Sequence, residues 1–255
     1  MKKKIIFIIS TILLISVAVA VGIKSMNSPI VKAKVTIKNN AINDSMNLAL
    51  TEYLALTEKF MKEPNLTFNF DYTLFSGENL DQLVENMNGS VSKMDSLYKM
   101  TTKNSELVID STFAVSLDHE SKKIMLGWSS RMDRRYDITI NFKKFIQESK
   151  EVESVFVDAS SDTSIRTFKI LPKSGGGYIL LSIHKHTGFP KRVEIFNPAD
   201  GEMTFDDSRT VITYSKIQTR PVSLKEFSYK NYFQRNDSTI EVLPRYYKYE
   251  LLTNL

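Results

Sequence analysis

Alternation of apolar and polar residues in "LTFNFDYTLF", residues 66–75, most constrains the fold of this chain. Successive side chains of a β-strand point to opposite sides, so the pattern predicts a strand with one buried and one exposed face. Half-buried strands are typical of antiparallel sheets, which can leave one face open to solvent. The face predicted to be buried carries Leu66, Phe68, Phe70, Tyr72 and Leu74.

Strand-like runs separated by turn residues follow along most of the chain. Residues 89–128 predict a meander, in which the turn "DHES" contains His119. Further strand-like runs stand at residues 153–159, 163–171, 178–186, 191–196, 209–217, 226–233 and 238–251. There is no fixed-period repeat and no low-complexity linker, so we expect one domain from residue 44 to residue 255.

Two segments predict helices. Residues 44–63 have N-cap candidates at the start and apolar residues at helical spacing, and Pro64 ends the pattern. Residues 141–150, "NFKKFIQESK", space Phe142, Phe145 and Ile146 as the apolar side of a short amphipathic helix.

The N-terminal 23 residues predict a signal peptide or a signal anchor. Three lysines precede the run from Ile5 to Ile23, which is long enough to cross most of a bilayer and ends near a small-x-small cleavage site at Ala18–Ala20. The sequence leaves cleavage open. Residues 24–43 predict a basic linker or a short strand, because apolar residues and lysines alternate within residues 28–38.

Charge and cysteine content exclude several classes of function. Seven of the 34 basic residues are lysines within the first 43 residues, which hold no acid, and the rest of the chain has 27 basic and 29 acidic residues. A nucleic-acid binder concentrates positive charge on its folded domain, so we expect no nucleic-acid partner. The chain has no cysteine, which excludes disulfides, thiolate metal ligands and lipid-modified cysteine.

The stretch "SIHKHTGFPKRVEIFNPADGE", residues 182–202, holds two of the three histidines. His184 and His186 would point the same way on a strand, but a metal site usually takes three or four ligands. Gly188 and Pro190 favour a turn, and "NPADG" favours a second turn. We therefore interpret the stretch as two hairpins, and we interpret Gly175–Gly177 as a hairpin turn because no GK[ST] follows.

These turns and strands resemble the LolA-type proteins, periplasmic carriers and sensors. The similarity rests on "TGFP", the "DG" turn, the strand ending "SKI", Gly89 before a strand, and "LVIDSTFAVSLDHESKKIML", and it covers roughly residues 45–220. The basic-proline and arginine-aromatic elements of true carriers are missing where "SKMDSLYKM" stands. The resemblance implies an α+β fold, a curved antiparallel sheet forming an open half-barrel with an N-terminal helix and a short lid helix. The last thirty or so residues would be a C-terminal extension.

Such a fold implies a binding function in the periplasm or on the extracytoplasmic face of the inner membrane. We expect a concave apolar groove for a lipid, a lipoprotein or another hydrophobic cargo, with no catalytic residue, cofactor or metal. The alternative is a membrane-anchored scaffold that contacts protein partners of a bacterial cell-envelope apparatus; an enzyme is a third hypothesis. The groove and lid residues that we predict are Phe68, Phe70, Tyr72, Val115, Leu117, Phe142, Phe145 and Ile146.

Overall fold

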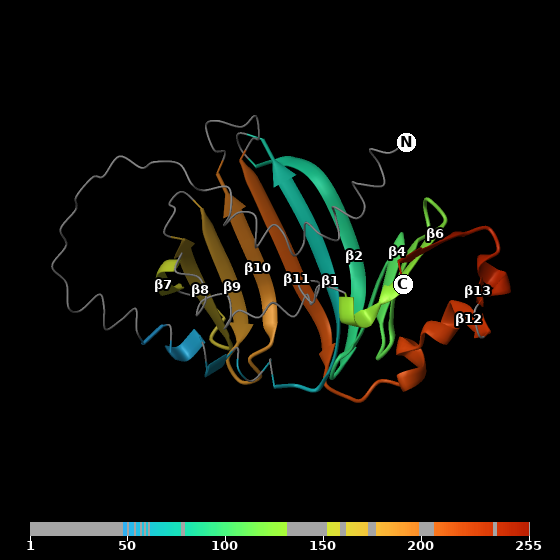
Figure 1. The fold of residues 1–255 in the computed structure, drawn as a ribbon. Helices are drawn as coiled ribbons and strands as arrows, with labels where there is room; N and C mark the ends of the chain where they lie inside the picture. The colour runs from blue at the N-terminus through green and yellow to red at the C-terminus, as the bar shows by residue number, and fades with distance from the viewer. Residues whose placement is uncertain are drawn as a thin grey trace. The chain divides into compact units, whose positions relative to one another are not determined.

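Strands dominate the computed structural model of this chain, and twelve of them form one sheet (Figure 1). The strand order is β14-β6-β5-β4-β3-β2-β1-β11-β10-β9-β8-β7, so β14 and β7 end the sheet without pairing with each other. The expectation of a large, open and mainly antiparallel sheet with few helices is confirmed. The structure describes residues 48, 49, 51–53, 55, 56, 58, 60, 62–77, 80–131, 152–158, 162–172, 177–198, 207–236 and 239–254.

The fourteen strands that the structure describes are 4 to 13 residues long. The first six are β1 Asn65–Ser76, β2 Gln82–Met94, β3 Leu97–Thr102, β4 Ser105–Ile109, β5 Phe113–Asp118 and β6 Lys123–Trp128. The next five are β7 Val152–Asp158, β8 Ile165–Pro172, β9 Tyr178–His184, β10 Pro190–Asn197 and β11 Ser208–Gln218. The hairpin of β12 Phe233–Asn236 and β13 Thr239–Val242 forms a separate sheet, and β14 is Glu250–Asn254. Short 3-10 helices are η1 Ser129–Arg131, η3 Leu224–Phe227, η4 Tyr229–Asn231 and η5 Pro244–Tyr246.

The chain divides into two compact units. Unit 1 comprises residues 1–62, 73–85 and 135–212, and unit 2 comprises residues 63–72, 86–134 and 213–255. The three longest strands, β1, β2 and β11, contribute residues to both units.

In unit 1, helical residues near the N-terminus pack with the β8–β10 hairpins. Every described residue between 48 and 60 is helical, and Tyr53 is fully buried. The Tyr53 ring meets Phe168 of β8 edge-on at 5.4 Å between ring centroids, and Phe60 meets Phe189 at 5.9 Å. The other positions of the predicted helix, 44–63, lie partly outside the described residues, so the whole helix stays a prediction.

The hairpin of β9 and β10 corrects one detail of the sequence interpretation. Strand β9 ends at His184, and His186 lies in the turn, so the two imidazoles do not share a strand face. The Gly188 N–H donates to the His184 carbonyl oxygen at 2.8 Å, and Gly188 has a φ of 74°, a conformation that favours glycine. The predicted hairpin itself is confirmed.

Unit 2 contains the predicted meander from β2 to β6. Consecutive strands pair antiparallel in continuous registers from Gly89↔Thr102 to Asp118↔Lys123. The antiparallel pairs from Gly89↔Thr102 to Met94↔Leu97 make β2 and β3 a hairpin, and Asp95 in its turn has a φ of 51°. The strand-like runs 226–233 and 238–251 are interrupted by η4 and η5, where the prediction of continuous strands is wrong. Among the described residues no helix is both long and apolar enough to span a bilayer. The predicted leader, 1–23, and linker, 24–43, lie outside those residues.

Candidate functional site

The register of unit 2 places the predicted groove residues of β1 and β5 on opposite faces of the sheet. Directly paired residues of neighbouring strands share a face. Val115 pairs with Val108, which pairs with Lys99, which pairs with Ser92 of β2. Val115 therefore lies on the face of Ser92, opposite Gly89.

Gly89 fixes the face on which β1 carries its aromatic side chains. A Cβ atom built on Gly89 would lie 2.8 Å from Cζ of Phe70 and 2.5 Å from the Thr101 carbonyl oxygen. Phe70 thus lies on the Gly89 face, and Phe68 and Tyr72 share it because they alternate with Phe70 along β1. The five predicted groove residues that the structure describes are all buried, but they do not line one groove.

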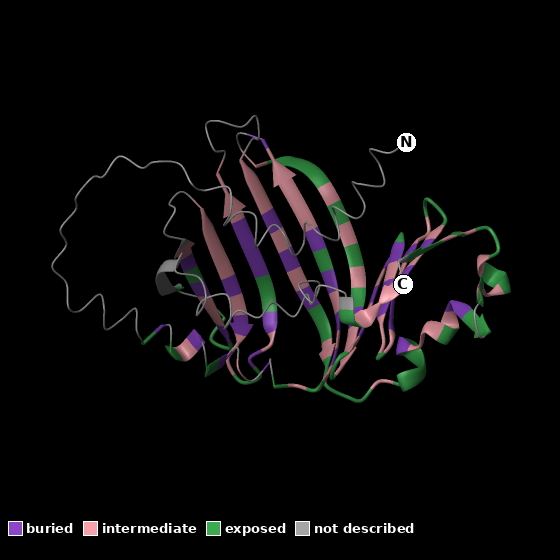
Figure 2. Ribbon diagram, viewed as in Figure 1, coloured by how far each residue is buried: buried purple, intermediate pink, exposed green. Residues whose placement is uncertain are grey.

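The face of Val115, which we call the C-terminal face, is covered by the chain's own C-terminal segment, residues 224–251. Figure 2 shows the buried residues of these elements. Tyr232 and Phe233 are 2% and 0% exposed and belong to the same core cluster as Val115 and Leu117. The cluster consists of Val108, Phe113, Val115, Leu117, Ile124, Leu126, Tyr232 and Phe233, with Trp128, Tyr229, Ile240, Val242, Tyr246, Tyr249 and Leu251 packed against it.

Phe113 at the start of β5 is the centre of this packing. Its ring stacks on Trp128 at 5.1 Å and meets Tyr229 and Phe233 edge-on at 5.0 and 5.6 Å. Aromatic pairs in such geometries stabilise beyond their buried area. The Asp110 carboxylate before β5 accepts hydrogen bonds from the backbone N–H of Phe113 at 2.7 Å and of Tyr229 at 3.0 Å. The C-terminal segment is therefore tied to the β4–β5 turn by both apolar and polar contacts.

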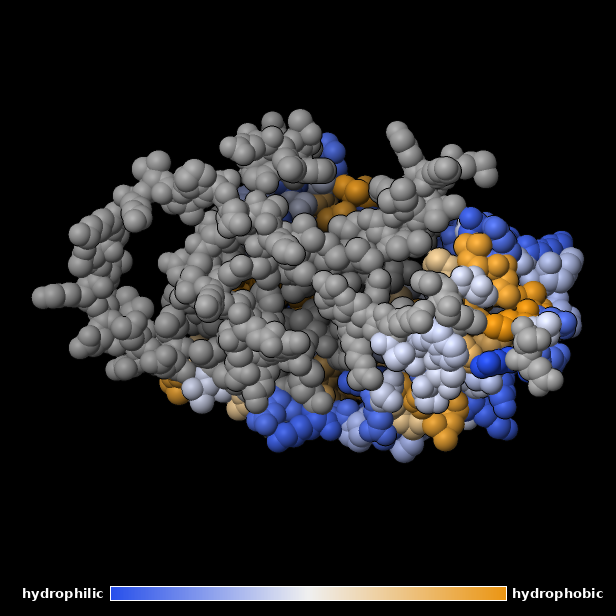
Figure 3. Space-filling model, in the orientation of Figure 1, coloured by the Kyte–Doolittle hydropathy of each residue, from blue (hydrophilic) through white to orange (hydrophobic). Residues whose placement is uncertain are grey.

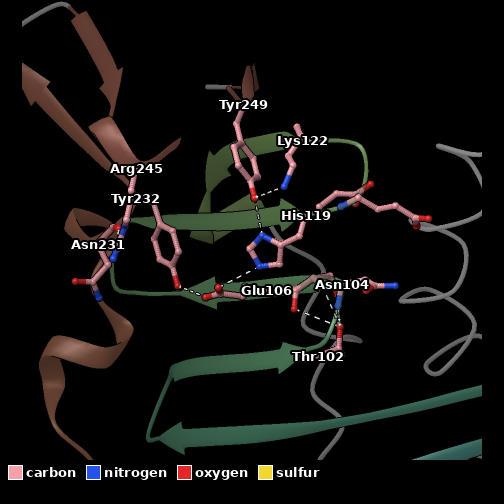
Figure 4. Close-up of polar contacts among 12 residues, drawn as sticks. Thr102, Asn104, Glu106, His119, Lys122, Asn231, Tyr232, Arg245 and Tyr249 are labelled. Atoms are coloured by element: carbon pink, nitrogen blue, oxygen red, sulfur yellow. Dashed lines mark hydrogen bonds and ion pairs between the residues drawn. The ribbon is translucent and has the colours of Figure 1, made fainter. Parts of the chain in front are cut away.

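A polar network at the edge of the cluster joins β4, the β5–β6 turn and the C-terminal segment (Figure 4). The Tyr232 hydroxyl donates to Oε2 of Glu106 at 2.8 Å. Nε2 of His119 lies 3.2 Å from Oε1 of Glu106, and Nδ1 lies 2.8 Å from the Tyr249 hydroxyl. Both oxygens of the Glu106 carboxylate are thus engaged. Nζ of Lys122 donates to the Tyr249 hydroxyl oxygen at 3.5 Å.

Burial is the main electrostatic effect on the tyrosines of unit 2. Burial raises the pKa of Tyr232 far above its ordinary value, and the hydrogen bond to Glu106 raises it further. Burial alone raises the pKa of Tyr214. Both phenols therefore stay protonated at neutral pH, which suits packing and hydrogen-bond donation.

The sequence predicts Glu106, Tyr232 and Tyr249 only as strand residues and His119 as part of a turn, and it predicts no contact among them. One signal was available, because His119 is one of only three histidines and lies outside the paired-histidine stretch. Only the fold brings Tyr232 to Glu106, 126 residues away, and Tyr249 to His119, 130 residues away.

The opposite face of unit 2, which we call the β1 face, carries a second set of buried side chains. Phe68 contacts Tyr214 of β11 edge-on at 5.6 Å. Tyr98 and Met100 of β3 share this face because they pair with Lys93 and Val91, which alternate with Ser92. Its buried members include Leu66, Phe68, Phe70, Tyr72, Val91, Tyr98, Met100, Leu107 and Tyr214.

Phe142, Phe145 and Ile146 of the predicted lid lie outside the described residues. In the described part of the chain, no three His, Cys, Asp or Glu side chains gather as metal ligands. On the visible surface of Figure 3, hydrophobic patches alternate with hydrophilic ones.

Solved structures similar to this chain include LolA-type proteins. A LolA superfamily protein from Nitrosomonas europaea has 12% identity and a TM-score of 0.35, over 72% of this chain and 98% of that chain. An uncharacterized conserved protein from Thermus thermophilus has 9% identity and a TM-score of 0.45, over 81% and 99%. A putative outer membrane lipoprotein-sorting protein domain from Vibrio parahaemolyticus has 8% identity and a TM-score of 0.32, over 74% and 98%.

Sequence comparison gives no such relatives: no family model and no curated protein matches the chain.

Proposed function

We propose that this chain is an extracytoplasmic binding protein that holds a lipid, a lipoprotein or another hydrophobic cargo against the β1 face. The supporting observation is that the unit 2 sheet carries buried apolar side chains on both faces, and that the C-terminal segment packs on only one of them, the C-terminal face. A sheet face rich in large apolar side chains needs a covering layer. We therefore place the cargo on the β1 face, beneath the layer that buries Phe68 and Phe70.

The chemistry of the β1 face suits an acyl chain. Phe68 and Phe70 offer apolar ring surfaces, and burying such surface contributes about 25 cal/mol per Å². Tyr72 and Tyr214 add phenol groups that can meet a polar end of the cargo. The burial of these side chains favours a covered face, so the predicted lid with Phe142, Phe145 and Ile146 stays part of the proposal.

The proposal differs from the groove expected from the sequence. Val115 and Leu117 pack under Tyr232 and Phe233, and we leave them out of the cargo site. The proposed role is binding without catalysis or a cofactor. We also propose that residues 1–23 direct the chain across the inner membrane, so that it works in the periplasm or on the extracytoplasmic face of that membrane.

A photoreactive fatty acid tests the cargo site. The full-length protein, kept soluble by an amphipathic polymer, is irradiated with a diazirine-labelled fatty acid, and the labelled residues are mapped by mass spectrometry. We expect saturable labelling on β1, β2 and β3 near Phe68 and Phe70, suppressed by unlabelled fatty acid. Labelling that does not saturate, or that maps to the C-terminal face, contradicts the proposal.

Matched variants of β1 separate binding from folding. Phe70→Leu keeps an apolar side chain but removes the buried ring, so we expect a loss of stability of about 1–3 kcal/mol and weaker labelling when the variant is assayed under conditions where it is fully folded. Asp71→Asn, at the neighbouring exposed position, is the control and should label like the native chain.

A second candidate function is a membrane-anchored scaffold of a cell-envelope apparatus. The filled C-terminal face favours it, because a packed face presents a rigid surface to partners and no hollow to cargo. Intact mass of the protein isolated from membranes discriminates the two. A retained N-terminal segment supports the scaffold, and cleavage near Val21 supports a carrier.

A further inference from the structure

Among the described strands, the first half of β2 has a neighbour on one side only. The antiparallel register between β2 and β3 begins at the pair Gly89↔Thr102, and β3 then turns into β4. Residues Gln82–Asn88 of β2 therefore extend beyond β3, with β1 as the neighbour on the other side. Alternate residues of this stretch direct their N–H and C=O groups away from β1. In the described part of the chain no strand pairs with them.

Most side chains of this stretch are exposed, and only Glu85 and Met87 are half-buried. Leu83 is 60% exposed and Val84 is 58% exposed, although they point to opposite sides of the sheet. Figure 2 shows the run of exposed residues at the start of β2. Natural sheets usually protect such edges with Lys, Pro or a bulge. Residues 82–88, "QLVENMN", contain neither Lys nor Pro.

The edge is acidic. Residues 81–92 include Asp81 and Glu85 and no basic residue. Partial burial raises the pKa of Glu85, so a cation placed opposite it would favour the charged carboxylate. Leu83 and Met87 share the face of Glu85, whereas Val84 shares the other face with Asn86 and Asn88.

We propose that Gln82–Asn88 is a docking edge for an extended segment of a partner protein, which adds a strand beside β2. Main-chain hydrogen bonds to the open edge provide affinity, and side chains opposite β2 provide specificity. The partner segment has a basic residue opposite Glu85 and apolar residues opposite Leu83, Val84 and Met87. This interaction does not depend on the cargo proposed for the β1 face.

Two fluorescent heptapeptides test this edge, Thr-Val-Thr-Lys-Val-Val-Thr and the same peptide with Glu in place of Lys. Binding to the full-length protein in detergent micelles is measured by fluorescence anisotropy. We expect the Lys peptide to bind at least about fivefold more tightly, because a cross-strand pair changes from attraction to repulsion. Methylation of alternate backbone nitrogens in the Lys peptide should abolish binding. Equal binding of the Lys, Glu and methylated peptides, or no binding of any, overturns the proposal.

Charge variants at half-buried Glu85 and at exposed Glu120 test the role of the edge charge outside the buried core. Glu85→Lys should reverse the preference, so that the Glu peptide binds more tightly than the Lys peptide. Glu120→Lys, an equal charge change in the exposed β5–β6 turn, should leave the preference unchanged. Loss of preference in both variants would mean a general charge effect and would overturn the proposal.

A second copy of the chain is the competing occupant. Sedimentation of the native chain and of Leu83→Lys decides this point. Self-association that is lost in Leu83→Lys would overturn the proposed foreign partner. A monomer in both cases, together with Lys-peptide binding that Leu83→Lys weakens, supports it.

Discussion

Phe70 of β1 and Val115 of β5 lie on opposite faces of the same sheet. Phe70 lies on the side of Gly89, and Val115 lies on the side of Ser92. One face is packed by the C-terminal segment, and the other is the place where we propose a cargo binds.

Gly89 is required for the close approach of β2, β3 and Phe70. Gly89→Ala places a Cβ atom 2.5 Å from the Thr101 carbonyl oxygen, so strand and ring must shift, and we expect a loss of about 1–3 kcal/mol. Urea unfolding of the full-length chain measures it. Ser90→Ala is the matched control, because Ser90 is exposed on the other face. Equal stability of the two variants would contradict this packing.

Phe233 holds the C-terminal segment on the C-terminal face. The side chain is fully buried against Phe113, so Phe233→Ala should lose about 3–5 kcal/mol. Trp128 is the single tryptophan and stacks on Phe113, so its emission should shift to longer wavelength in this variant. Tyr247→Ala, at a position 72% exposed, should change stability by no more than about 0.5 kcal/mol and leave the emission unchanged.

The Glu106 network should show energetic coupling between distant residues. Tyr232→Phe removes the donor of the hydrogen bond and Glu106→Gln replaces its charged acceptor by a neutral amide, and a double-mutant cycle should give a coupling of about 1 kcal/mol. Tyr72→Phe on the β1 face serves as the uncoupled partner in a second cycle. A coupling near zero between Glu106 and Tyr232 would be inconsistent with the contact.

Stability should fall in alkali because buried phenols must ionise. The pKa of Tyr214 and of Tyr232 is raised in the folded chain, so the folded state keeps phenolic protons that the unfolded state loses. Their contribution is fully present below about pH 10 and is lost as pH rises beyond it. Tyrosinate absorbance and circular dichroism should therefore change together for these groups. The variant Tyr214→Phe should unfold at a higher pH, and an unchanged midpoint would argue against this cause.

Cargo affinity should depend on chain length. Each methylene removed from water contributes about 0.8 kcal/mol, so Kd should fall by up to about fourfold per added methylene until the site is full. Isothermal titration with a series of saturated fatty acids measures this slope. A flat series would indicate recognition of the headgroup only and would count against an apolar site on the β1 face.

The sequence by itself determined which residues share a face within a strand. Alternation along residues 66–75 predicted the buried set of β1, and Gly188 with Pro190 predicted the β9–β10 turn, because both signals depend on local geometry. The resemblance to LolA-type proteins likewise came from turns and alternation.

Only the tertiary structure decided on which face of the sheet the buried side chains of each strand lie, and what covers that face. Alternation has a period of two and is blind to the register between strands, so Phe70 and Val115 looked equivalent in sequence. The covering of Val115 by Tyr232, and the meeting of Glu106 with His119, depend on contacts between residues far apart along the chain. Such contacts form only in the folded chain, because they depend on how distant segments pack together and not on the residues next to them in the sequence.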